Sequence, residues 1–178
     1  MHDASSTTSG KPDGNPDGRT TDSHHNAGAP LTLSQLSALI DKELGESEWF
    51  AIDQPSINAF ADVTGDWQSI HVDEELARVG PFGGTIAHGF LTLSLLSAMA
   101  FNVLPTLDGQ QNSVNYGLNS VRFITPVRSG ERVRGRFTLK QVTQRSITSI
   151  QLTIGVVVEI EDHQKPALVA EWLTLINT

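Results

Sequence analysis

A carboxylate and an imidazole lie five residues apart in one short segment of this sequence, as Asp66 and His71. Gly65 ends an expected helix just before them, which predicts that both side chains lie on a loop. Trp67 and Ile70 lie between them and would help to bury that loop. Desolvation of such a pair would push the two pKa values apart and suit acid/base catalysis. The same spacing also arises by chance, with a helix-capping aspartate beside a surface histidine, so both interpretations stay open.

Gly89 stands near the expected start of the next helix, at residues 85–87. N–H groups in a first helical turn lack partners inside the helix and lie in positive dipole potential. A thioester carbonyl placed there would find an oxyanion hole. Tight packing of the helix against a strand explains a glycine at this position equally well. Ser97 lies eight residues further on, on the same helical face, and would hydrogen-bond either into the site or to its own helix backbone.

Other chemistry is limited by what the sequence lacks. His88 is either a second base or a buried histidine whose hydrogen bonds are satisfied, and the second interpretation is favoured. The absence of cysteine excludes disulfides, a thiol nucleophile and thiolate metal sites. No nucleophile elbow, phosphate loop, dinucleotide fingerprint or zinc-protease motif is present, and neither a cofactor nor a metal is expected. His24 and His25 are adjacent without partner ligands and are expected to be solvated.

Length and composition predict one domain with a tail. Residues 1–30 contain almost nothing apolar and are expected to be disordered, whereas residues 31–178 form the folded domain. The formal net charge of −8 argues against nucleic acid as a partner. Arg122, Arg128 and the arginines at 132, 134 and 136 are expected to lie on solvated strand faces. The absence of cysteine and of a signal peptide favours the cytoplasm.

The periodicity of apolar residues predicts four helices and a sheet. The helices are expected at 31–44, 55–65, 73–78 and 86–104, with a short strand at 48–53. Four β-rich runs follow at 113–126, 131–142, 146–161 and 167–176, and their short connections favour an antiparallel meander.

The run at 86–104 is apolar on nearly every face, so it must be surrounded by protein. Its polar residues, which include His88, Asn102 and several serines and threonines, argue against a membrane span. The pattern therefore predicts an α+β fold in which a curved antiparallel sheet wraps a long central helix.

Several spaced motifs also carry a resemblance to a known family. They occupy residues 61–66 with His71 beyond, 80–90, 115–123 and 166–171. The chain resembles the MaoC-like, hydratase-2 branch of the hot-dog-fold proteins, and most closely its NodN-like members. The resemblance covers residues 47–176 and implies a hot-dog fold, usually dimeric, that acts on acyl thioesters of coenzyme A or acyl carrier protein.

The resemblance also implies roles for individual residues. The catalytic aspartate and histidine of the family fall on Asp66 and His71, the oxyanion glycine on Gly89 and a supporting serine on Ser97. The family often has Asn-Pro ahead of the apolar residue and the histidine, whereas this chain has Gln68 and a serine. Gln68 still offers an amide to the site, but losing the proline loosens the loop.

The expected activity is therefore that of an (R)-specific enoyl-CoA hydratase, which in reverse is a 3-hydroxyacyl-thioester dehydratase. The expected assembly is a homodimer. Two alternatives remain: a thioesterase on the same fold, and an acyl-thioester-binding subunit whose altered loop no longer catalyses. Asp66 is favoured as the base, with His71 orienting water, although the pair would titrate as a unit.

Overall fold

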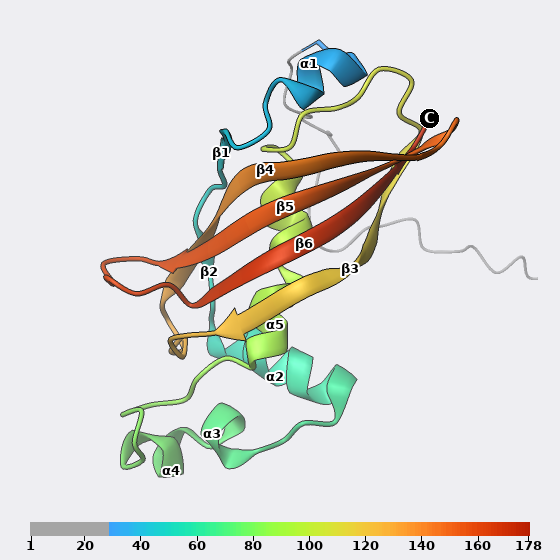
Figure 1. Cartoon of the computed structure of the whole chain (residues 1–178). Helices are drawn as coiled ribbons and strands as arrows, with labels where there is room; N and C mark the ends of the chain where they lie inside the picture. The colour runs from blue at the N-terminus through green and yellow to red at the C-terminus, as the bar shows by residue number, and fades with distance from the viewer. Residues whose placement is uncertain (1–28) are drawn as a thin grey trace, which may run out of the picture.

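Six antiparallel strands form one sheet in the computed structural model, which describes residues 29–178. Three long strands follow one another in chain order, a fourth pairs beyond the last of them, and two short strands pair on the opposite side (Figure 1). The sheet order is β1-β4-β5-β6-β3, with β2 also paired to β4. The strands are β1 (Glu43–Glu46), β2 (Phe50–Ala51), β3 (Asn112–Phe123), β4 (Arg132–Ser146), β5 (Ser149–Ile160) and β6 (Leu168–Asn177).

All four predicted β-rich runs are confirmed as strands, but the meander is correct only for β4, β5 and β6. β3 pairs with β6, and two strands, β5 and β6, separate it from β4, which follows it in the chain. The link between β3 and β4 is too long for a hairpin turn. Its ends are held apart, because the Ile124 N–H donates to Ala167 O and the Gly130 N–H donates to Ile52 O.

Six helical segments complete the fold: α1 (Leu33–Ser37), α2 (Gln54–Thr64), α3 (Ser69–Val72), α4 (Glu74–Arg78), α5 (Gly89–Ser94) and α6 (Leu96–Ala100). The predictions for α2 and α4 are confirmed. Asp53 caps α2 by accepting a hydrogen bond from the Ser56 N–H at 2.9 Å. Gly65 ends α2 with a φ of 76°, a left-handed conformation that glycine adopts readily. None of the helices within residues 29–178 combines the length and apolarity needed to cross a membrane.

Two helix predictions are wrong in extent. A capping box of Thr32 and Gln35 starts α1, but α1 ends at Ser37 and residues 43–46 pair with β4 instead of extending the helix. The gain of sheet hydrogen bonds outweighs the helical pattern there. The expected helix at 86–104 consists of α5 and α6, which meet at Leu95, and the backbone of Leu95 remains in the right-handed helical region. The strand predicted at 48–53 is only two residues long, as β2.

The concave side of the sheet packs against α5 and α6 (Figure 1). Phe137 and Ile154 of the sheet and Met99 of α6 are almost fully buried in this core. The prediction that protein surrounds the helix on all sides is wrong within one chain, since Phe90 is 67% and Phe101 53% exposed.

Charges lie on the outer face of β4, as expected for its arginines. Arg132, Arg134 and Arg136 each form ion pairs with glutamates, which confirms that they line a strand face. All but the last two residues of the tail predicted at 1–30, including its histidine pair, lie outside the described residues, so its disorder stays a prediction.

Candidate active site

Asp66 and His71 are positioned by the turn that ends α2. The left-handed Gly65 directs the chain away from α2, and Asp66 lies in the loop that follows. His71 lies on α3 and not on the loop, because its N–H donates to Gln68 O at 2.9 Å and closes a short helical turn. The Gln54 side chain of α2 donates to the His71 carbonyl at 2.8 Å, which fixes α3 against α2.

His71 is buried, and one of its ring nitrogens is held by the backbone. Its Nδ1 lies 2.7 Å from the carbonyl oxygen of Ile86. A carbonyl oxygen only accepts, so in the neutral ring Nδ1 carries the hydrogen and Nε2 keeps a lone pair. His71 Nε2 is therefore a hydrogen-bond acceptor, which can accept a hydrogen bond from water or take up a proton.

His88 links the imidazole to the carboxylate. Its ring stacks on His71 with centroids 3.8 Å apart and contacts the Phe60 ring at 5.1 Å. Its Nε2 donates to the backbone carbonyl of Asp66 at 2.9 Å. The burial expected from the sequence is confirmed, with 3% of the residue exposed, but Nδ1 has no hydrogen-bond partner among the described residues. His88 thus holds the Asp66 backbone beside the His71 ring.

The Asp66 carboxylate is half-exposed and is held by Gln68. The backbone N–H and the side-chain Nε2 of Gln68 donate to Oδ1 at 3.4 and 3.2 Å. Partial desolvation raises the pKa of Asp66. The hydrogen bonds from Gln68 and the nearby imidazoles of His88 and His71 lower the pKa, and together they outweigh the desolvation. The net pKa lies below the ordinary value of 3.8, so the carboxylate is ionised at neutral pH.

Side-chain ligand atoms of Asp66, His71 and His88 all lie within 4.8 Å of one another, which raises the question of a metal. The two imidazoles are stacked with an interplanar angle of 24°, so their in-plane lone pairs run nearly side by side. Because a zinc ion needs nitrogen ligands that converge at about 2.0–2.1 Å, this arrangement is better suited to holding water and protons than to holding a metal.

Gly89 and His71 line the same cavity, whose volume is about 390 Å³. Gly89 is the first residue of α5, where backbone N–H groups lack acceptors inside the helix. A Cβ at this position would lie 2.9 Å from the Phe123 ring of β3. Packing against a strand is therefore sufficient to require glycine here, and Gly89 and Phe123 both line the cavity.

Three of the predicted residues, Asp66, Gln68 and Ser97, are not among the residues that line the cavity of His71 and Gly89. The Asp66 carboxylate lies within 4.8 Å of a His71 ring nitrogen and is held by Gln68, whereas Ser97 lies elsewhere. Ser97 accepts a hydrogen bond from Asn115 Nδ2 at 3.2 Å. Sequence reasoning missed Thr92, Phe123 and Val127, which do line that cavity. Phe123 and Val127 come from parts of the chain remote from the motif, and no spacing in the sequence signals that they meet it.

Comparisons with known proteins show what the whole chain is similar to. The family model described as "MaoC like domain" matches residues 35–161. The chain is 52% identical over 148 residues to nodulation protein N of Rhizobium leguminosarum bv. viciae, covering 83% of this chain and 92% of that protein. It is 46% identical over 140 residues to 3-hydroxyacyl-thioester dehydratase Z of Mycobacterium tuberculosis, covering 79% and 92%. Among solved structures, a monoamine oxidase regulatory protein from Archaeoglobus fulgius superposes with a TM-score of 0.68 at 24% identity, covering 84% of this chain and 95% of that one, which supports the fold alone.

Proposed function

The chain belongs to the MaoC-like domain family, and on this premise we propose that it is an (R)-specific enoyl-CoA hydratase, or in reverse a 3-hydroxyacyl-thioester dehydratase. The observation that carries the proposal is the convergence of Asp66 and His71 beside the cavity that Gly89 lines. The relative from Mycobacterium tuberculosis, whose name states this class of reaction, supports it.

The proposed chemistry adds one water across the double bond of a trans-2-enoyl thioester. The thioester carbonyl accepts a hydrogen bond from the Gly89 N–H, which stabilises negative charge on the oxygen as the enolate forms. Water is held between the Asp66 carboxylate and His71 Nε2. Asp66 accepts a proton while the water oxygen bonds to C3, and that proton then goes to C2. The product is a 3-hydroxyacyl thioester, and dehydration follows the same steps in reverse.

Hydration of crotonyl-coenzyme A tests this proposal. We expect the wild-type protein to remove the enoyl absorbance without releasing free thiol, and Asp66→Asn and His71→Ala each to reduce turnover by about a hundred- to ten-thousand-fold. Asp62→Asn, a change of the same kind on the exposed side of α2, should retain full activity. Release of thiol would indicate a thioesterase instead. Binding of the thioester without turnover would indicate a non-catalytic acyl-binding subunit.

We also propose that two copies of the chain associate along β3. β3 is an edge strand, and its Val114, Tyr116, Leu118 and Phe123 are exposed although they are apolar. An exposed edge with apolar side chains favours strand pairing with a second copy, the commonest symmetric arrangement being a dimer. Light scattering should give twice the chain mass, and Val114→Glu should shift the protein toward the monomer. A wild-type monomer would contradict this assembly.

The substrate carrier and the compartment are proposals of the same kind. We propose acyl thioesters of coenzyme A or acyl carrier protein as substrates and the cytoplasm as the location. The support is the family membership together with a sequence that contains no cysteine.

A further inference from the structure

Three hollows follow one another along the line where α5 and α6 face β3. The active-site cavity shares Phe90 with a hollow of about 260 Å³. That hollow in turn shares Ser97, Asn115 and Trp172 with a third one of about 410 Å³, which we call the distal cavity. The helical backbone rises about 12 Å between Gly89 and Ser97. An acyl chain of about ten carbons, extended from a thioester at Gly89, would therefore reach the distal cavity.

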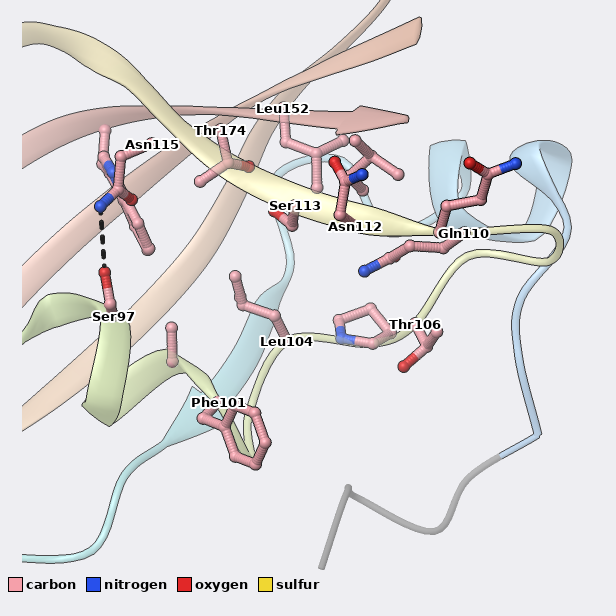
Figure 2. A pocket seen from close by; sticks show the side chains of 15 residues that line it. Ser97, Phe101, Leu104, Thr106, Gln110, Asn112, Ser113, Asn115, Leu152 and Thr174 are labelled. Carbon is pink, nitrogen blue, oxygen red and sulfur yellow. Dashed lines mark hydrogen bonds between the residues drawn. The ribbon is translucent and has the colours of Figure 1, made fainter. Parts of the chain in front are cut away.

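The distal cavity has a polar wall, which is unusual for a site that receives a hydrocarbon chain. Figure 2 shows the hydrogen-bonded pair of Ser97 and Asn115 at one end of the cavity and Gln110 near the other. The polar side chains in its wall include Ser97, Thr106, Gln110, Asn112, Asn115 and Thr174. A cavity shaped only to hold an alkyl chain would be lined mostly by apolar side chains, with few polar groups.

Thr174 is the strongest indication of what the distal cavity binds. The residue is 3% exposed, and its Oγ1 has no hydrogen-bond partner among the described residues. In the sheet it lies between Leu152 of β5 and Asn115 of β3, and all three residues line the cavity. A buried hydroxyl that has lost its water without gaining a partner is unfavourable, and a polar ligand group would satisfy it.

The neighbouring side chains add a second donor and acceptor. Asn115 donates through Nδ2 to the Ser97 oxygen at 3.2 Å. Because a hydroxyl both donates and accepts, the Ser97 O–H remains available, as does the Asn115 carbonyl oxygen. Together with Thr174, these groups would bind an oxygen atom that accepts one hydrogen bond and donates another.

We propose that the distal cavity binds an oxygen-bearing segment of the acyl chain, so that the preferred substrates are medium-length acyl thioesters with a hydroxyl group remote from the thioester. This inference rests on the proposed function, because it takes the thioester to lie at Gly89. A plain alkyl chain would fill the same space and leave the Thr174 hydroxyl unpaired, whereas a hydroxylated chain would pair it.

Calorimetric binding of two saturated, unreactive thioesters tests the inference separately from catalysis. The probes are decanoyl-coenzyme A and ω-hydroxydecanoyl-coenzyme A, titrated into the whole protein. We expect the wild type to bind the hydroxylated probe about three- to tenfold more tightly, the range expected from one net hydrogen bond. Thr174→Val removes the hydroxyl with little change of shape and should abolish the preference. Thr174→Ser keeps the hydroxyl and should retain it.

Thr153→Val is the matched control. Thr153 is also buried on β5, but it follows Leu152 directly, so its side chain faces the other side of the sheet. This variant should keep the wild-type preference. Equal affinity of the wild type for the two probes, or a preference that persists in Thr174→Val, would overturn the inference. Hydration of crotonyl-coenzyme A by the wild type, measured in parallel, tests the proposed function alone, because its short chain does not reach the distal cavity.

Discussion

Along the line where α5 and α6 face β3, the polar groups at the two ends differ in whether they have hydrogen-bond partners. At the catalytic end, backbone carbonyls of Ile86 and Asp66 hold one ring nitrogen of His71 and one of His88. At the distal cavity, the buried Thr174 hydroxyl has no partner among the described residues. On the two proposals, the groups that hold a water in one geometry are fixed in advance by the fold, whereas the group that recognises a ligand is left to be satisfied by it. His88 Nδ1 is the exception at the catalytic end, since it too lacks a partner.

The largest expected effect tests whether the catalytic end acts as one unit. Asp66→Asn and His71→Ala should each reduce crotonyl-coenzyme A turnover by about a hundred- to ten-thousand-fold. Because both side chains are proposed to hold the same water, the double variant should lose little more than either single variant. Steady-state rates of the three variants decide this. Multiplied losses in the double variant would show that the two residues act independently.

A smaller effect is expected where a side chain is forced into the cavity wall. Gly89→Ala places a methyl group 2.9 Å from the Phe123 ring and should displace the ring or the start of α5. We expect kcat/KM to fall by about tenfold to a hundredfold, as positioning errors of this size do. Combining it with Phe123→Leu should restore much of the activity by relieving the clash. If the combination restores no activity, the clash with Phe123 is not the cause of the loss in Gly89→Ala.

Loss of the hydrogen bond that holds Asp66 should have a smaller effect again. His88→Phe keeps an aromatic ring beside His71 and loses the bond to the Asp66 carbonyl, so kcat should fall by about tenfold while KM changes little. The matching control is Phe60→Leu, which alters the other ring contact of His88 but no hydrogen bond. Equal losses of kcat in the two variants would indicate a packing role for His88 and no positioning role.

The variants above are expected to lose activity, whereas a variant in the distal cavity should gain stability. Thr174→Val in the protein without ligand removes a buried hydroxyl that has no partner and should raise the free energy of unfolding by about 1 kcal/mol. Urea unfolding measures this change. A loss of stability would mean that the Thr174 hydroxyl is already satisfied, which would remove the contrast between the two ends.

The smallest expected effect concerns the ionisation of Asp66. Gln68→Leu keeps the backbone N–H at this position but removes the side-chain hydrogen bond, which is one of the influences that lower the pKa of Asp66. The pKa should therefore rise, and the carboxylate should become protonated at a higher pH than in the wild type. Stability linked to the ionised form is present above the unfolded pKa and is lost as the pH falls through the folded pKa, so this loss should also begin at higher pH. NMR titration of the Asp66 carboxyl group measures the shift, and an unchanged midpoint would contradict the role of Gln68.

The sequence predicted the regular parts of the fold better than their pairing. Alternation in β4 to β6 and the glycine that ends α2, Gly65, are local signals, and they predicted these elements correctly. The pairing of β3 with β6 and of residues 43–46 with β4 depends on partners far along the chain, which no local pattern encodes. Asp66, His71 and Gly89 were singled out by spacing and family resemblance. The role of Thr174 was not, because it is one of several threonines in an alternating strand and its unpaired oxygen exists only in three dimensions.

The central claim is that Asp66, His71 and the Gly89 N–H converge on a single water and a single carbonyl oxygen. A crystal structure of the Asp66→Asn variant with crotonyl-coenzyme A tests it most directly. The account predicts a thioester oxygen about 2.7–3.1 Å from the Gly89 nitrogen, and one water between His71 Nε2 and the side chain at position 66. A thioester bound away from Gly89, or a substrate double bond that is out of reach of a water held by His71, would contradict it.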